Sequence, residues 1–234
     1  MLLEVEDIHT AYGLIRVLFG ISIKVDQGQV VTLLGRNGVG KTTTLRSVMG
    51  LTPPQSGSIK WMGSEIRGLP PYRISQMGIG FVPEDRRIFS DLTVWENLDV
   101  AIKSAGLDEP EWTMDRVFEL FPALEMLRNR RGGYLSGGEQ QMLTIARTLM
   151  GNPKLLLLDE PSEGLAPVII QQLGDQISKL KQEGMTMLLS EQNSEFSLGL
   201  SDGIYILEKG EVRFEGTVEE FMKDEETCRA YLTI

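Results

Sequence analysis

The chain has 234 residues, of which 41% are hydrophobic and 24% are charged, and its 23 Lys and Arg against 33 Asp and Glu give a net charge of −10. This length suits a single α/β unit with an inserted subdomain. The acidic balance argues against nucleic acid as a partner and against direct adhesion to anionic lipid, because both require a cationic surface.

The chain has one cysteine, Cys228, so no disulfide can form within it, as expected in a reducing compartment. The N-terminal segment carries acidic residues early and lacks a basic region before a long apolar run, so it does not resemble a signal peptide. No apolar run approaches the ~18–20 residues that a transmembrane helix needs. We therefore expect a cytosolic chain, soluble when isolated, that meets a membrane only through a partner.

In the first part of the chain, short apolar runs alternate with turn residues, which predicts strands joined by tight connections. The glycine-rich stretch Gly35–Gly40 separates a strand at 30–34 from a predicted helix at 41–49. The other strands predicted here span residues 2–8, 21–25, 58–62 and 79–82.

From Thr93 to about Met150 the pattern turns helical, which predicts an inserted helical subdomain with helices at 94–104, 114–121 and 138–150. Leu155–Leu158 then has four leucines, as expected of a strand buried on both faces of a parallel sheet. The remaining predictions are a helix at 167–183, a strand at 185–189, a hairpin of 204–208 with 211–215, and an amphipathic helix at 218–231.

The segment at 35–42 reads GRNGVGKT and fits the phosphate-loop pattern G-x-x-x-x-G-K-[ST], in the strand–loop–helix context that the pattern requires. Its glycines let backbone N–H groups turn toward phosphate oxygens, and the following helix directs its positive end at the same anion. Lys41 would reach the β- and γ-phosphates, and the Thr42 hydroxyl would bind Mg²⁺. The nucleotide-binding residues predicted here are Gly35, Arg36, Asn37, Gly38, Val39, Gly40, Lys41, Thr42 and Thr43.

The leucine strand ends in Asp159 and Glu160. Acids at the carboxyl end of such a strand lie at the edge of the sheet where the phosphate loop also lies.

A further motif, LSGGEQQ, occupies residues 135–141. Ser136 can cap a helix, and Gly137 and Gly138 leave backbone N–H groups uncovered at its start, so the segment could bind an anion. A plain capped helix explains the local features equally well.

In this order and spacing, the motifs resemble those of ATP-binding cassette (ABC) ATPases, and the resemblance covers nearly the whole chain. It implies an α/β P-loop NTPase fold, with a RecA-like core and a mainly parallel sheet, an antiparallel β part and an inserted helical subdomain, together forming an L-shaped cassette. A single domain over 1–234 is expected, with the core and β part at 1–90 and 151–217, the helical subdomain at 91–150 and a C-terminal helix at 218–234.

The resemblance also assigns roles. It implies that Asp159 holds Mg²⁺ and that Glu160 is the general base that polarises the attacking water. It matches Tyr12 to the aromatic residue that stacks on adenine, although an ordinary strand-end tyrosine is the alternative. It implies that Ser136, Gly137 and Gly138 contact the γ-phosphate bound to another subunit. The expected assembly is a head-to-tail dimer, with itself or with a paralogous ATPase.

Two positions depart from the family pattern. Glu84 follows the strand at 79–82, where a glutamine usually reaches Mg²⁺, and a carboxylate can also bind this ion. Gln192 stands where most members have a histidine that contacts the γ-phosphate, and it can donate a hydrogen bond but cannot carry charge. Catalysis is therefore expected to depend more strongly on Glu160.

Segments 82–89, 163–167 and 191–193 resemble the ATPases of branched-chain (hydrophobic) amino acid importers, whereas 35–42 resembles those of urea and short-chain amide importers. We expect an ATPase subunit that powers amino acid uptake through a membrane permease at the cytoplasmic face of the inner or plasma membrane. An extracytoplasmic substrate-binding protein would supply the substrate. The alternatives are a urea or amide importer subunit and a soluble ABC ATPase that acts as a mechanical switch.

Overall fold

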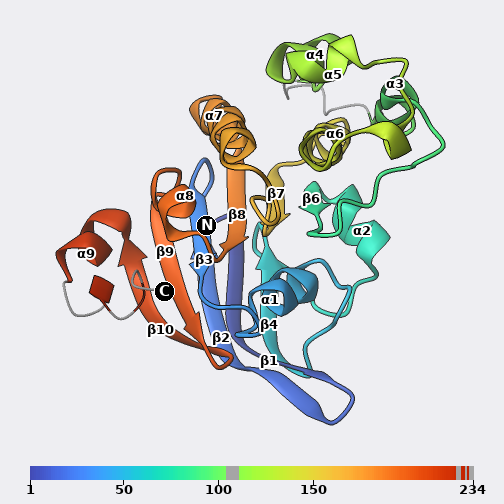
Figure 1. The fold of residues 1–234 in the computed structure, drawn as a ribbon. Helices are drawn as coiled ribbons and strands as arrows, with labels where there is room; N and C mark the ends of the chain where they lie inside the picture. Colours follow the sequence, from blue (N-terminus) through green and yellow to red (C-terminus); the bar gives the residue numbers. More distant parts are fainter. Residues whose placement is uncertain (104–110, 225–227, 230, 232–234) are drawn as a thin grey trace.

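The computed structural model describes residues 1–103, 111–224, 228, 229 and 231. Its strands form two sheets, one of four strands and one of six (Figure 1). None of the helices in the described part of the chain combines the length and the apolar composition that a membrane span requires.

The smaller sheet is antiparallel. Its strands run in the order β2 (Ile15–Val25), β1 (Leu3–Tyr12), β4 (Ser56–Trp61) and β5 (Ser64–Glu65). The strands predicted at 2–8 and 21–25 are confirmed, but both are longer than predicted. The pairing of β1 with β2 shifts register between Ile8 and His9 and again between Thr10 and Ala11. Such irregularities interrupt the alternation of apolar and polar residues on which a strand prediction depends.

The phosphate loop and the acids Asp159 and Glu160 lie at one edge of the larger sheet. Its order is β10 (Glu211–Thr217), β9 (Gly203–Glu208), β3 (Val30–Leu34), β8 (Thr186–Glu191), β7 (Leu155–Asp159) and β6 (Ile79–Val82). All neighbours are parallel except the β9–β10 hairpin. Leu34 pairs with Glu191, and Asp159 pairs with Ser190, so β3, β8 and β7 end side by side.

The leucines of β7 explain why this strand is apolar at every position. Leu156 and Leu158 belong to a core cluster that includes side chains of the helices on one face of the sheet. Leu155 and Leu157 belong to a second cluster, which extends from the other face to the smaller sheet. Both faces are buried, as the sequence predicts.

A group of helices lies beyond β6 in Figure 1. It comprises α3 (Val94–Asp99), α4 (Met114–Leu120), α5 (Pro122–Met126), the 3-10 turn η1 (Gly132–Tyr134) and α6 (Gly137–Leu149). Helix α3 is shorter than the predicted 94–104, because Ile102 N–H bonds to Asp99 O in a turn and Lys103 N–H bonds to Met150 O. Residue 104 lies outside the described residues. The subdomain boundaries at 91 and 150 remain a prediction.

The remaining helices are α1 (Lys41–Val48), α2 (Pro71–Gln76), α7 (Pro167–Gln182), α8 (Ser194–Leu198) and α9 (Val218–Lys223). Helix α1 contacts strands of both sheets. The predicted helix at 218–231 is not continuous, since α9 ends at Lys223 and Asp224 leaves the helical conformation with φ −86° and ψ 87°, whereas Cys228, Arg229 and Tyr231 are again helical. Residues 225–227 of that prediction lie outside the described part of the chain.

Candidate functional site

The phosphate loop joins the end of β3 to the start of α1. Gly40 has a φ of 112° and is the N-cap of α1, a conformation that L side chains rarely adopt. A Cβ atom on Gly35 would lie 2.5 Å from the Leu207 carbonyl oxygen of β9. The strand thus leaves no room for a side chain at the first position of the loop, and the positive φ favours glycine at the last.

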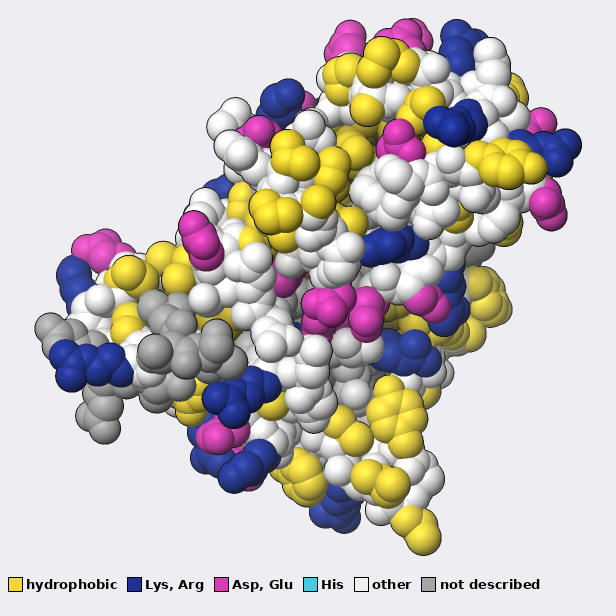
Figure 2. Space-filling view, in the orientation of Figure 1, with side chains coloured by type: hydrophobic (Ala, Val, Ile, Leu, Met, Phe, Trp, Pro, Cys, Tyr) yellow, Lys and Arg dark blue, Asp and Glu magenta, His cyan; other side chains and the backbone are white. Residues whose placement is uncertain are grey.

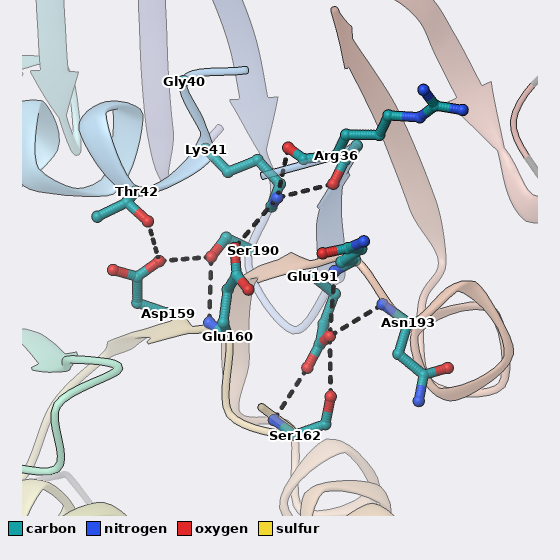
Figure 3. Close-up of polar contacts among 12 residues, drawn as sticks. Arg36, Gly40, Lys41, Thr42, Asp159, Glu160, Ser162, Ser190, Glu191 and Asn193 are labelled. Atoms are coloured by element: carbon teal, nitrogen blue, oxygen red, sulfur yellow. Dashed lines mark hydrogen bonds and ion pairs between the residues drawn. The ribbon is translucent and has the colours of Figure 1, made fainter. Parts of the chain in front are cut away.

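Lys41 is 2% exposed and its ammonium lies under the loop (Figure 3). Nζ donates to Gly35 O at 2.7 Å and to Arg36 O at 3.0 Å, and it lies 3.1 Å from Oε1 of Glu160. Beside it is a cavity of about 300 Å³ lined by Val17, Gly38, Gly40, Lys41, Thr42, Thr43 and Glu160. The predicted phosphate lysine and the predicted general base therefore form a buried ion pair at this cavity.

Asp159 lies on the opposite side of the α1 N-terminus from the loop carbonyls. Its Oδ1 accepts from the Thr42 hydroxyl at 2.9 Å and from the Ser190 hydroxyl at 2.6 Å. Burial raises the pKa of Asp159 above its ordinary value, while the hydrogen bonds from Ser190 and Thr42 oppose that shift. A hydroxyl and a carboxylate side by side are ligands of the type that Mg²⁺ takes.

Within the described ranges, no group of three or more His, Cys, Asp or Glu side chains is placed to hold a metal ion. The Thr42–Asp159 pair is a partial ligand set, which suits Mg²⁺ because this ion usually binds through one or two carboxylates together with water and substrate phosphates.

Glu160 is 8% exposed and has a φ of 44°, which is uncommon for a residue other than glycine. Its backbone N–H donates to Ser190 O at 3.0 Å. The conformation turns the chain immediately after β7 and brings the carboxylate to Lys41.

Glu84 and Gln192 are both exposed, at the ends of β6 and β8. Partial burial raises the pKa of Glu84, and the negative charges of Glu160, Asp159 and Glu163 raise it further. The Glu84 carboxyl is therefore close enough to these acids to be affected by their charge. In the view of Figure 2, acidic side chains gather near the centre of the molecule, with basic side chains near them. The backbone N–H of Gln192 donates to the Glu191 carboxylate at 3.2 Å.

Tyr12 ends β1 and is 46% exposed. Partial burial acts to raise the pKa of its phenol, but hydrogen bonds with Thr52 and Thr43 and the charge of Arg46 outweigh that effect and lower the pKa. Arg46 and Thr43 belong to α1, so the ring lies next to the helix that begins at Lys41.

The LSGGEQQ motif begins α6, which lies apart from α1 in Figure 1. The Ser136 hydroxyl accepts from the backbone N–H of Glu139 at 3.4 Å, and the Glu139 carboxylate accepts from the backbone N–H of Ser136 at 2.6 Å. A Cβ on Gly137 would lie 2.9 Å from the Arg86 guanidinium, and one on Gly138 would lie 2.6 Å from the Ile169 side chain. The structure does not bring this motif together with the phosphate loop of the same chain.

Four residues that contact the site, Ser162, Ser190, Glu191 and Arg86, are not among the predicted site residues. Ser190 holds Asp159, Glu191 accepts hydrogen bonds from Ser162, and Arg86 donates to Glu163 O at 2.9 Å beside Gly137. Ser190 and Glu191 are polar residues at the end of an otherwise apolar strand, which is the same signal that identified Asp159 and Glu160.

The chain matches the ABC transporter family over residues 18–163. It is 46% identical over 231 residues to the high-affinity branched-chain amino acid transport ATP-binding protein BraG of Pseudomonas aeruginosa, with 99% of each chain covered. It is 35% identical to the probable branched-chain amino acid transport ATP-binding protein LivF of Archaeoglobus fulgidus, covering 96% of this chain and 95% of LivF. It is also 35% identical to the lipopolysaccharide export system ATP-binding protein LptB of Escherichia coli, covering 98% and 96%.

Among solved structures, the fold resembles a dimeric structure of a bacterial ABC transporter cassette, with a TM-score of 0.81 and 25% identity. The match covers 92% of this chain and 98% of that cassette.

The buried Glu191 carboxyl predicts a pH dependence of stability. Burial raises its pKa from the ordinary 4.5 to about 7, so between these values the folded chain holds a proton that the unfolded chain has released. The free energy of unfolding should therefore fall as the pH rises through this interval. Relative to Glu191→Gln, the fall should be about 3 kcal/mol.

Urea unfolding of the wild type and of Glu191→Gln, measured from about pH 4.5 to pH 7, tests this prediction. The difference between the two curves removes the contribution of carboxyls that both chains share. Parallel curves would show that Glu191 ionises alike in the folded and unfolded chains.

Proposed function

This chain belongs to the ABC transporter family and is an ATP-binding, ATP-hydrolysing subunit, and we propose that it powers uptake of branched-chain or other hydrophobic amino acids through a membrane permease. The observation that supports the hydrolytic role most directly is the meeting of Lys41, Thr42, Asp159 and Glu160 at one cavity. The 46% identity to BraG, against 35% to LptB, favours amino acid transport over lipopolysaccharide export.

In this proposal the phosphate loop and Lys41 bind the ATP phosphates, and Tyr12 stacks on adenine. Thr42 and Asp159 hold Mg²⁺, with Glu84 beside them. When bound, Mg²⁺ would neutralise negative charge on the phosphate oxygens. Lys41 would then leave Glu160, because a polyphosphate attracts the ammonium more strongly than one carboxylate does.

Glu160, released from Lys41, serves as the general base. Its carboxylate would accept a proton from the attacking water, and its position after β7 is fixed by the hydrogen bond from its N–H to Ser190. Gln192 would orient a phosphate oxygen as a neutral donor. Because Gln192 carries no charge and cannot transfer a proton, removal of the proton from water depends on Glu160.

The LSGGEQQ segment fits a shared site. The start of α6 is a capped helix N-terminus with no lysine of its own, and the phosphate loop lies elsewhere in the same chain. A head-to-tail dimer, with itself or with a paralogous ATPase, would place Ser136, Gly137 and Gly138 against the nucleotide of the other chain.

A groove between the core and the helical region fits a permease contact. Its volume is about 430 Å³, and apolar and basic side chains line it, among them Leu51, Phe81, Arg87 and Arg147. A helix of the permease docked here would contact both parts of the chain and would hold the subunit at the cytoplasmic face of the membrane. An extracytoplasmic binding protein would then act on transport only through the permease.

Glu160→Gln should lower the rate of ATP hydrolysis by at least about 100-fold, because general bases contribute 10²–10⁴-fold. ATP binding should persist, since the amide leaves the phosphate loop intact. Phosphate release and nucleotide binding measure the two effects separately. Glu119→Gln, an exposed change on α4, is the matched control and should hydrolyse ATP as the wild type does. Turnover near the wild-type rate in Glu160→Gln would refute this base.

Gly137→Val should abolish ATP-driven dimerisation while the monomer still binds ATP. The new Cβ would lie 2.9 Å from the Arg86 guanidinium, and the branched side chain would cover the N–H groups that begin α6. Light scattering with and without ATP measures dimerisation. Dimers that form normally in the variant would count against a shared site.

Transport assays decide the substrate. The chain, reconstituted in vesicles with its permease and binding protein, should drive ATP-dependent uptake of labelled leucine and not of urea. Uptake of urea alone would favour the alternative importer. Purification of the chain in a stable soluble complex with nucleic acid, without permease subunits, would contradict a transport role.

A further inference from the structure

Glu191 connects two loops beside the ATP site through one buried carboxylate (Figure 3). Its Oε1 accepts from the Ser162 N–H at 3.1 Å. Its Oε2 accepts from the Ser162 hydroxyl at 3.0 Å and from the N–H groups of Gln192 at 3.2 Å and Asn193 at 3.3 Å. The side chain is 2% exposed.

The chemistry of these contacts is unusual for a buried acid. Every donor named above is neutral, and burial of a carboxylate without a paired cation is costly. Burial accordingly raises the pKa of Glu191 to about 7. A side chain that only filled the space would not need a charge. A carboxylate suits this position because both of its oxygens only accept, and here they accept from N–H and O–H donors of two loops.

Both loops are close to Glu160: one follows it in the chain, and the other follows Ser190, whose carbonyl oxygen accepts from the Glu160 N–H at 3.0 Å. Ser162 follows Glu160 by two positions and is buried, and the exposed residues Glu163 and Gly164 come next. Gln192 begins the loop that follows β8. A displacement of either loop would therefore reach the other through the Glu191 carboxylate.

We propose that Glu191 is a positioning residue that holds the Gln192 loop and the segment beginning at Ser162 in fixed relation, so that Gln192 keeps its place beside the ATP site. This inference rests on the proposed ATPase function. Glu191 itself touches neither nucleotide nor water in the reaction and acts through Ser162 and Gln192.

Glu191→Gln keeps the shape of the side chain but changes its hydrogen bonding. An amide has one acceptor oxygen and one NH₂ group. If the oxygen takes the place of Oε2, the NH₂ group faces the N–H of Ser162; in the opposite orientation it faces those of Gln192 and Asn193. In either case, the NH₂ group faces backbone N–H donors and one loop loses its backbone hydrogen bonds to this side chain, so the connection between the loops is weakened.

The test compares kinetics across a small set of variants. Glu191→Gln should lower kcat about tenfold or more while KM and the Kd for MgATP change less than about threefold, because orientation and not nucleotide binding is lost. Ser162→Ala should have a smaller effect. The double variant should be no slower than Glu191→Gln, since both changes break the same connection.

Thr186→Val is the matched control. Thr186 is buried at the other end of β8, and its hydroxyl accepts from the Gly28 N–H at 2.8 Å. The substitution removes one buried hydrogen bond from the same strand and should lower the Tm without lowering kcat per folded molecule.

Two outcomes would overturn the inference. One is a kcat of Glu191→Gln that equals that of Thr186→Val. The other is a rise in KM with kcat unchanged, which would place Glu191 in nucleotide binding. If the wild type releases no phosphate, or Glu160→Gln is as fast as the wild type, the proposed function fails instead, and this inference fails with it.

Discussion

The parallel register of β3, β8 and β7 is the constraint on which the site depends. It sets Leu34 opposite Glu191 and Asp159 opposite Ser190, so the phosphate loop and the acids leave the sheet at the same edge. Cross-strand bonds maintain this arrangement, including the Gly35 N–H to Glu191 O at 3.3 Å. Because these strands are buried on both faces, a register shift would move each side chain to the opposite core cluster and disturb the packing of both, so core packing also fixes the geometry of the site.

Among the buried charged groups beside that apolar core, Lys41 and Glu160 form an ion pair at 3.1 Å. Such a pair adds little net stability, because desolvation offsets the attraction. It does place one positive and one negative side chain at the cavity. In the proposed mechanism a polyphosphate would separate them, so the same contact would link nucleotide binding to the release of the general base.

The sequence alone predicts the parts of this site that are local in the chain. The phosphate loop, the strand ending in Asp159 and Glu160, and the capped start of α6 each lie within a short segment with its own pattern. The contacts of Ser162 with Glu191 join residues 29 positions apart, and no local pattern reveals them. The predicted helix at 218–231 is interrupted at Asp224, a break that amphipathic spacing does not detect. The roles of Glu84, Gln192 and Tyr12 remain predictions.

The central claim is that each ATP site is formed by two chains, and a mixing experiment tests it most directly. Glu160→Gln and Gly137→Val are each expected to be inactive, but a head-to-tail dimer of one with the other has one site with both halves intact. An equimolar mixture should therefore hydrolyse ATP faster than either variant alone, up to about a quarter of the wild-type rate, which is the value for random pairing of independent sites. Activity no greater than that of the separate variants would contradict a shared site.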